Sequence, residues 1–165
     1  MANILVRRCS YGRNDVFHGA GAQIVEPHII IGRFTKDFGP GFYCTVMREQ
    51  AVRQAKRQST PVVNEYTVRV ESSLDVLEFK GITNEWLDFI ASCRRGIPHQ
   101  LDIVIGPMAD DQIWNFVADY LDGNITRDQF WALARFKYPT HQIAFCTERS
   151  LPCLRFSTSE EVAPW

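Results

Sequence analysis

The chain has 165 residues, of which 45% are hydrophobic and 22% are charged, and its formal net charge is −1. This length favours one domain with a single core, and the near-neutral charge argues against non-specific binding to nucleic acid or membranes. No apolar stretch is long enough to span a bilayer, and the N-terminus lacks the residue order of a secretory signal. We therefore expect a cytoplasmic protein with one domain over residues 1–165 and a core at about 16–156.

The N-terminal half predicts two short strands, Val16–His18 and Phe42–Val46, separated by a loop rich in glycine and proline. Arg48–Gln58 is rich in helix formers, and its small residues at i and i+4 would allow close packing on a sheet. Two further strands are expected at Val62–Val70 and Leu74–Phe79, where β-forming residues predominate.

The C-terminal half continues with helices and short strands. Asn84 can cap a helix that runs to about Arg95, and Leu101–Ile105 predicts a strand. Acidic residues precede a helix over Gln112–Leu121, and Thr126 with Gln129 forms a capping box for another. The last strands are expected at Gln142–Thr147 and Cys153–Phe156, followed by a frayed tail. These elements predict an α+β domain.

The cysteines and histidines do not indicate a metal centre or a disulfide framework. The five cysteines are odd in number and contain no C-x-x-C pair, and the four histidines lack metal-ligand spacing. We therefore expect no metal, and cysteines that serve as apolar core residues in a reducing compartment. The basic residues of the helices, including the pair Arg94-Arg95, are interpreted as solvated helix faces, and the helical tryptophans as core residues.

The composition of Phe38–Tyr43, taken together with His18-Gly19, indicates a functional site. Two glycines flank a proline, and a tyrosine follows on the next strand. Glycine lets the backbone approach a ligand closely, a tyrosine can stack on a ring, and a histidine can hold a hydroxyl. Such a set suits a flat, polar, heteroaromatic ligand, whereas the common nucleotide-loop, zinc-hydrolase and serine-hydrolase motifs are absent from the sequence.

These motifs resemble those of the ADP-ribosyltransferase superfamily, in the His-Tyr-Glu branch that includes poly(ADP-ribose) polymerases and diphtheria-like toxins. His18-Gly19 matches its first motif, and Phe38–Tyr43 matches its F-G-x-G-x-Y loop and strand tyrosine. Its third motif begins a later strand with a glutamate, where this chain has Gln142. The chain is similar, more narrowly, to small bacterial domains related to these enzymes, through the segments 32–45, 63–66, 102–111 and 142–147.

The resemblance implies a fold of two small, roughly perpendicular sheets flanked by helices, with NAD bound as substrate between them. It implies that His18 holds the adenosine ribose, that the Gly19 backbone binds the nicotinamide amide and that Tyr43 stacks on the nicotinamide ring. Arg33 is a candidate for the pyrophosphate. The remaining expected contacts come from the glycine loop and from polar strand residues: Phe38, Gly39, Gly41, Thr45 and Asn64.

The third catalytic position is the main departure from the family. Gln142 can accept a hydrogen bond from the ribose 2′-hydroxyl but carries no charge, so it would stabilise an oxocarbenium-like transition state less than a glutamate. Asp110 and Asp111 are candidates for the missing carboxylate, and the equally weighted alternative is that both merely complement the positive N-terminus of the following helix. On this basis, a glutamate introduced at position 142 is expected to preserve or raise turnover.

The sequence thus predicts a mono-ADP-ribosyltransferase that transfers one ADP-ribose from NAD to an unidentified protein, nucleic acid or small molecule. By resemblance, a toxin, defence or modification role is implied, with an inhibitory antitoxin as a potential partner. Two alternatives stay open. One is a non-enzymatic module that binds NAD or ADP-ribose, and the other is an NAD glycohydrolase that uses water as acceptor.

Overall fold

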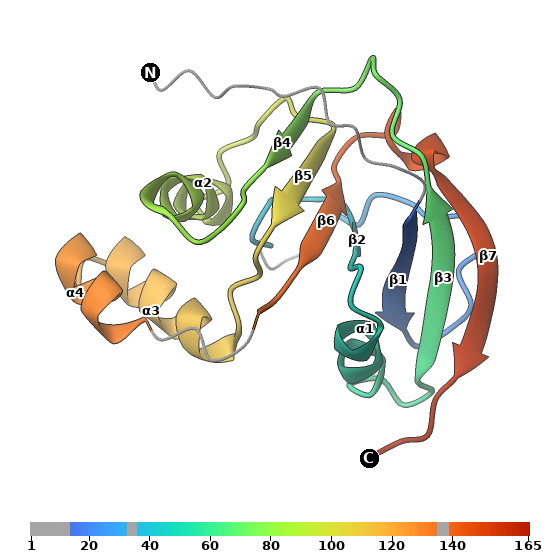
Figure 1. The fold of residues 1–165 in the computed structure, drawn as a ribbon. Helices are drawn as coiled ribbons and strands as arrows, with labels where there is room; N and C mark the ends of the chain where they lie inside the picture. The colour runs from blue at the N-terminus through green and yellow to red at the C-terminus, as the bar shows by residue number, and fades with distance from the viewer. Residues whose placement is uncertain (1–13, 33–35, 135–138) are drawn as a thin grey trace.

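The computed structural model describes residues 14–32, 36–134 and 139–165. Its seven strands form two sheets, and its four α-helices pack around them (Figure 1). The α+β class expected from the sequence is confirmed, and so is its division into two small sheets. None of the helices in the described residues has the length and apolar character needed to cross a bilayer.

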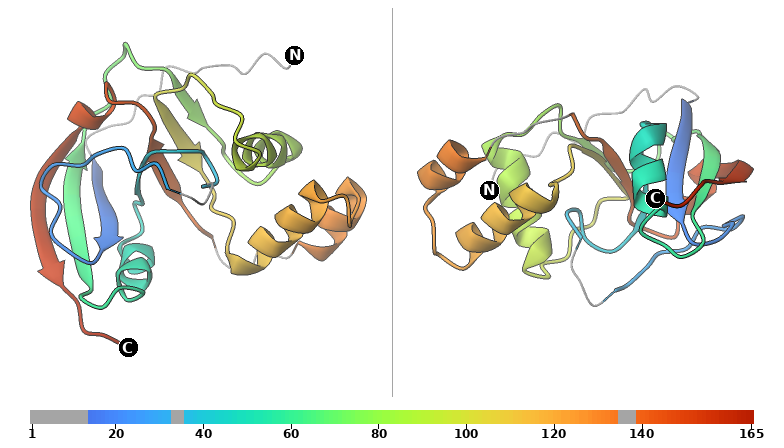
Figure 2. Two further views of the ribbon diagram at one scale, coloured as in Figure 1. Left: turned by 180° about the vertical axis from the view of Figure 1, so that it is seen from behind. Right: turned by 90° about the horizontal axis from the view of Figure 1, so that it is seen from below.

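The first sheet is antiparallel, in the order β1-β3-β7, and consists of β1 (Asn14–Ala20), β3 (Val62–Val68) and β7 (Leu154–Glu161). The helix α1 (Arg48–Ala55) lies beside β1 and β3 (Figures 1 and 2). Its buried residues are Ala51 and Ala55, as expected from their spacing, and they pack with Val63.

The second sheet has the order β2-β6-β5-β4, with β4 and β5 parallel and the other pairs antiparallel. Its strands are β2 (Phe42–Cys44), β4 (Val76–Glu78), β5 (Ile103–Gly106) and β6 (Gln142–Phe145). The helices on its outer side are α2 (Asn84–Arg94), α3 (Asp111–Leu121) and α4 (Arg127–Leu133) (Figures 1 and 2). Both β5 and β6 are fully buried, because helices cover one face and the first sheet covers the other.

Two apolar clusters hold these layers together. One lies between the sheets and includes Val16, Phe42 and Tyr66. The other lies between the second sheet and the helices and includes Trp86 and Phe130. The cysteines that the structure describes, Cys44, Cys93, Cys146 and Cys153, are unpaired.

Most predicted elements are confirmed, with corrections at their ends. The capping box of Thr126 with Gln129 is present, but α2 is capped by Thr83, whose hydroxyl accepts from the Trp86 N–H, and not by Asn84. The tail expected to fray from residue 157 instead pairs with β3 as far as Glu161. The exposed polar residues of this segment do not alternate with apolar residues, so the sequence pattern did not indicate a strand. Backbone hydrogen bonds can pair a strand at a sheet edge without such alternation.

Gly19 is required where α1 crosses β1. A Cβ atom at this position would lie 2.1 Å from the carbonyl oxygen of Ala51 and 2.6 Å from the backbone nitrogen of Ala55. Neither backbone atom can move away without shifting the helix. The glycine of the His18-Gly19 motif therefore has a packing role as well as a position in the cleft described below.

We expect Gly19→Ala to lower the free energy of unfolding by about 1–3 kcal/mol, because the added methyl group overpacks the strand–helix contact. Urea denaturation measures this change. Gly81→Ala is the matched control, since a Cβ there meets no atom within 4 Å, and it should stay within about 0.5 kcal/mol of the wild type. Equal stabilities of the two variants would contradict the close approach.

Candidate functional site

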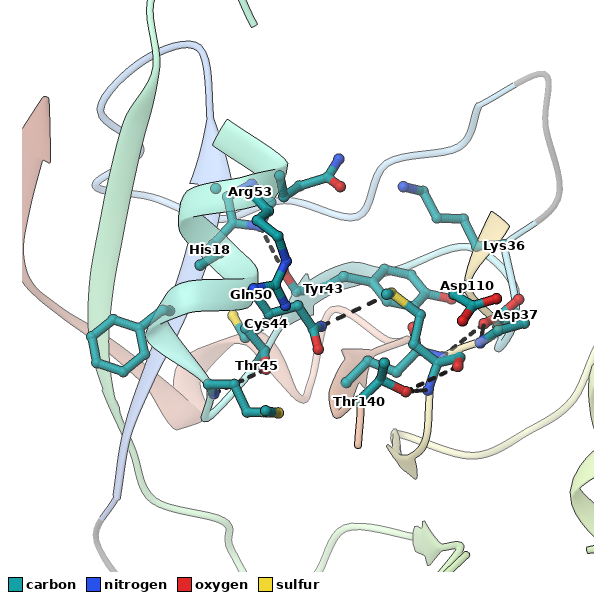
Figure 3. A pocket seen from close by; sticks show the side chains of 18 of the residues that line it. His18, Lys36, Asp37, Tyr43, Cys44, Thr45, Gln50, Arg53, Asp110 and Thr140 are labelled. Atoms are coloured by element: carbon teal, nitrogen blue, oxygen red, sulfur yellow. Dashed lines mark hydrogen bonds between the residues drawn. The ribbon is translucent and has the colours of Figure 1, made fainter. Parts of the chain in front are cut away.

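A cleft of about 920 Å³ lies between the α1/β1 side of the molecule and the residues around the start of β6 and α3. In Figure 3, Tyr43 lies between His18 on one side and Lys36, Asp37 and Asp110 on the other. The structure thus brings His18, Gly19, Tyr43, Thr45, Asp110 and Gln142 to one cleft. Its volume falls in the range of small-molecule sites.

His18 is held by its neighbours in one tautomer. Its Nδ1 lies 2.6 Å from the carbonyl oxygen of Tyr43, and its ring stacks on Phe42 with centroids 4.3 Å apart. Because a carbonyl only accepts, Nδ1 carries the hydrogen, and the neutral ring keeps a lone pair on Nε2. Burial lowers the pKa of His18; the bond to Tyr43 raises it by less, and the charge of Lys36 lowers it further. His18 is therefore suited to accept a hydrogen bond from a hydroxyl.

The backbone of Gly19 faces the opening between β1 and β2. Phe17 and Thr45 exchange two backbone hydrogen bonds of 2.8 and 2.9 Å in an isolated antiparallel bridge. Backbone groups alternate in direction along a strand, so the N–H and C=O of Gly19 point to the same side as those of Phe17. Continuing the same antiparallel register would place Gly19 opposite Tyr43. In the described structure, however, the pairing is limited to Phe17 and Thr45 and does not reach Gly19. Gly19 thus presents a donor and an acceptor to the cleft.

Tyr43 is fixed by the glycine loop that precedes it. Its hydroxyl donates to the carbonyl of Gly39 at 2.6 Å and accepts from the N–H of Phe38 at 3.1 Å. Burial raises the pKa of this hydroxyl, so it stays protonated. The Nζ of Lys36 lies over the ring, 5.4 Å from its centroid. The ring is therefore a rigid platform that already accommodates a cation.

A buried carboxylate lies at the base of the cleft beside Tyr43. Asp37 Oδ1 accepts from Arg94 at 2.6 Å, and the side chains of this ion pair are only 5% and 4% exposed. Asp37 Oδ2 accepts from the Ala109 N–H at 2.9 Å and from Gln142 Nε2 at 3.0 Å. The interpretation of Arg94 as part of a solvated helix face is therefore wrong, because its guanidinium neutralises this carboxylate and lies against the Trp114 ring at 3.3 Å.

The same contacts orient Gln142, which is 6% exposed. Its Nε2 donates to Asp37 and also to the Pro107 carbonyl at 3.2 Å. Since both partners only accept, the amide nitrogen must face them, and the orientation of the amide is settled. Its Oε1 has no hydrogen-bond donor among the residues that the structure describes. Gln142 lines the cleft, and its Oε1 remains available to accept a hydrogen bond.

The two acidic candidates next to α3 have different outcomes. Asp110 lines the cleft and also caps α3, since its Oδ1 accepts from the Ile113 N–H at 2.9 Å. Capping uses one carboxylate oxygen, which leaves the other for a ligand. Asp111 begins α3, but its side chain lies outside the described part of the chain, as does the whole of Arg33.

Several predicted contact residues lie outside the cleft and have structural roles. Phe38 is a core residue, Gly39 provides the left-handed turn of the loop with φ +82°, and Gly41 lets β2 approach β6 closely. Asn64 is fully buried, accepts from the Ile24 N–H and donates to the Ala22 carbonyl. These four residues are not among those that line the cleft, whereas Thr45 is.

Sequence reasoning missed three residues that shape the cleft. Asp37 stood inside the segment 32–45 that carries the resemblance, but it was assigned no role. Gln50 of α1 exchanges two hydrogen bonds of 2.7 and 3.1 Å with the backbone of His141, next to Gln142. Trp114 was assigned to the core, yet it is 36% exposed and lines the cleft. Of these three residues, only Asp37 could have been noticed in the sequence, because it is an acidic residue directly before an aromatic residue and a glycine.

The cleft is lined by three basic side chains, Lys36, Arg53 and Arg57. They indicate that an anionic group of a ligand is favoured there. Among the described residues, no group of three or more histidine, cysteine or acidic side chains could hold a metal ion.

Comparison with known proteins gives a family but no activity. Residues 15–156 match the model of the family described as "Protein of unknown function (DUF3990)". The chain belongs to this family. No curated protein and no solved structure matches the chain. The matched range coincides closely with the expected core at about 16–156, and it includes every described residue of the cleft.

We expect Asp37→Asn to lower the free energy of unfolding by about 3–5 kcal/mol, because it leaves the buried Arg94 charge without a counter-ion. Thermal or urea unfolding measures the loss. Asp88→Asn is the matched control: it breaks an ion pair of an exposed carboxylate with Arg127 and should cost less than about 1 kcal/mol. A cost for Asp37→Asn as small as that of the control would show that the buried pair is dispensable.

Acid should destabilise the protein through two partly buried histidines, His18 and His141. Burial lowers the pKa of His18 and of His141, so below pH about 6.5 the unfolded chain binds protons that the folded protein does not. The free energy of unfolding should fall as the pH is lowered from 7.5 to 5.5, and His18→Asn should reduce this slope. Urea titrations at several pH values measure it, with the exposed His28→Asn as control. An unchanged slope in His18→Asn would contradict the prediction for His18.

Proposed function

We propose that the protein is a mono-ADP-ribosyltransferase that transfers ADP-ribose from NAD to a nucleophilic acceptor, and that its two sheets form the ADP-ribosyltransferase fold. The observation that carries the proposal is the arrangement of three groups at one opening: the free backbone edge of Gly19, the Tyr43 ring and the Nε2 atom of His18. They come from the two motifs on which the resemblance rests.

Nicotinamide has the chemistry that this opening requires. Its carboxamide has one acceptor oxygen and two N–H donors, which complement the N–H and C=O of Gly19. Its ring is planar and, in NAD, positively charged, so it would stack favourably on Tyr43. A ribose hydroxyl would donate to His18 Nε2, and Lys36 and Arg53 would lie near the pyrophosphate. The cleft volume of about 920 Å³ is large enough for such a dinucleotide.

The transfer step breaks the bond between the ribose C1′ and the nicotinamide nitrogen. The electron pair of that bond leaves with neutral nicotinamide, and C1′ becomes oxocarbenium-like, as in glycoside hydrolysis. Gln142 Oε1 would accept from the 2′-hydroxyl and stabilise this charge weakly, because it is neutral. The acceptor then adds to C1′ and loses its proton, for which the second oxygen of Asp110 is the candidate base.

Asp37 acts through Gln142 in this scheme. Three donors occupy its two oxygens, and its side chain is 5% exposed, so it is poorly placed to take a proton from an acceptor. It holds the Gln142 amide with Oε1 left for the substrate. We therefore treat Asp37 as a positioning residue, and the weak stabilisation by an amide favours transfer of a single unit over chain growth.

A non-enzymatic NAD- or ADP-ribose-binding module is the second candidate. It is favoured by one observation, the neutral Gln142 at the position where a carboxylate is expected. An NAD glycohydrolase would use the same cleft with water as acceptor. A toxin or defence role and an inhibitory partner remain implications of the resemblance. Together with the cytoplasmic location expected from the sequence, they belong to this proposal.

The test is the release of nicotinamide from NAD by the purified protein, with and without cell lysate. We expect release that increases with lysate, and its loss in His18→Asn, which keeps a donor for the Tyr43 carbonyl and removes the Nε2 acceptor. Tyr43→Ala should weaken NAD binding by about 1–3 kcal/mol through lost stacking. His28→Asn is the control, because it changes an exposed histidine outside the cleft lining.

Each of the other outcomes of this test favours one of the alternative functions or overturns the proposed site. Release without lysate and unaffected by it would favour the glycohydrolase. Binding of NAD without release would favour the non-enzymatic module. Absence of both binding and release from a folded protein, or full activity in His18→Asn, would overturn the proposed site.

A further inference from the structure

The ammonium group of Lys36 occupies the place that a cationic ligand ring would take. Its Nζ lies over the Tyr43 ring, 5.4 Å from the centroid, and its side chain is exposed at the cleft. The cation–π contact involves the ammonium group of Lys36, and no carboxylate forms an ion pair with that group among the described residues. Two positive charges cannot share one ring face without repulsion, so a cationic ring must displace this ammonium group.

The charged groups around Lys36 leave its ammonium group available to an anionic ligand. The adjacent carboxylate, Asp37, is already neutralised by Arg94 and bonded to Ala109 and Gln142. Lys36 therefore contributes to the cleft a positive charge that forms no ion pair with a described carboxylate, although Asp110 lines the same cleft. That charge reaches His18, where it helps to lower the pKa. An anion entering the cleft would draw the flexible lysine side chain toward itself.

We propose that Lys36 is a specificity-determining residue that selects ligands carrying a cationic aromatic ring and an anionic group in one molecule. This inference rests on the proposed function of the cleft. Without ligand, Lys36 covers the Tyr43 ring. When such a ligand enters, its phosphates attract the ammonium group, and its ring takes the vacated face of Tyr43.

The exchange discriminates between ligands by their charge. A cationic ring without phosphates must displace Lys36 and receives no compensation, so it binds poorly. An anionic nucleotide without the cationic ring gains the attraction between its phosphates and Lys36 but leaves the Tyr43 ring uncovered. A dinucleotide with both charges satisfies both groups, and the cleft thereby favours oxidised NAD over its fragments.

Two probes test the inference by calorimetric titration: 1-methylnicotinamide, a cationic ring without phosphate, and ADP-ribose, which has the phosphates without the ring. We expect Lys36→Gln to bind 1-methylnicotinamide about two- to fivefold more tightly and ADP-ribose about fivefold more weakly. The affinity for ADP-ribose should also depend less steeply on salt in this variant. Lys80→Gln is the matched control, because it removes the same charge from an exposed lysine outside the cleft.

The opposite signs separate this role from a structural one. A damaged cleft would weaken the binding of both probes. Loss of the Lys36 charge, in contrast, strengthens the binding of 1-methylnicotinamide and weakens that of ADP-ribose. If both affinities change in the same direction, or neither differs from Lys80→Gln, Lys36 is not the selector, and the proposed function is unaffected. If the wild-type protein binds neither ADP-ribose nor 1-methylnicotinamide, both the inference and the proposed cleft function fail.

Discussion

The buried charge of Asp37 determines how the separate segments around the cleft meet. One carboxylate binds Arg94 from α2, Ala109 from the segment before α3, and Gln142 from the start of β6. A buried carboxylate with fewer partners would be strongly unfavourable, so each of these contacts compensates for part of its desolvation. Because the charge must be matched from several directions, the loop before β2 cannot shift without breaking contacts to three other segments. The position of Tyr43, five residues from Phe38 in the same loop and strand, depends on this anchor.

A second constraint, on the opposite side of the cleft, is steric. The absence of a side chain at Gly19 brings the backbone of α1 against β1, and Gln50 then ties the same helix to the backbone beside Gln142. The helix therefore spans from the first sheet to the start of β6. The opening between β1 and β2 exists because Phe17 and Thr45 pair while Gly19 and Tyr43 do not. The buried contacts of Asp37 on one side and the close approach of α1 to Gly19 on the other together keep the edge of β1 at Gly19 open.

Much of the fold could be predicted from the sequence, because its local signals agree with the tertiary structure. The alternation of β-forming residues, the alanines at i and i+4 and the capping box of Thr126 all depend on near neighbours. The extension of β7 to Glu161 could not be predicted, since it depends on pairing with a strand some hundred residues earlier. For the site, His18, Gly19 and Tyr43 were recognisable as a motif. Arg94 was misread, because its burial depends on Asp37, which is distant in the sequence and adjacent only in the fold.

The contact between Asp37 and Gln142 also changes the meaning of the missing glutamate. By resemblance alone, a glutamate at position 142 was expected to preserve or raise turnover. In this cleft, a carboxylate there would lose the donor that bonds Asp37 Oδ2 at 3.0 Å and would face a second negative charge and the Pro107 carbonyl. One of the two carboxyl groups would then need a proton. The amide is therefore the side chain that this arrangement of acceptors requires. Asp37 and Gln142 are joined by a hydrogen bond. Under the proposed function, Asp37 supplies the buried charge and Gln142 would present a neutral acceptor to the ligand.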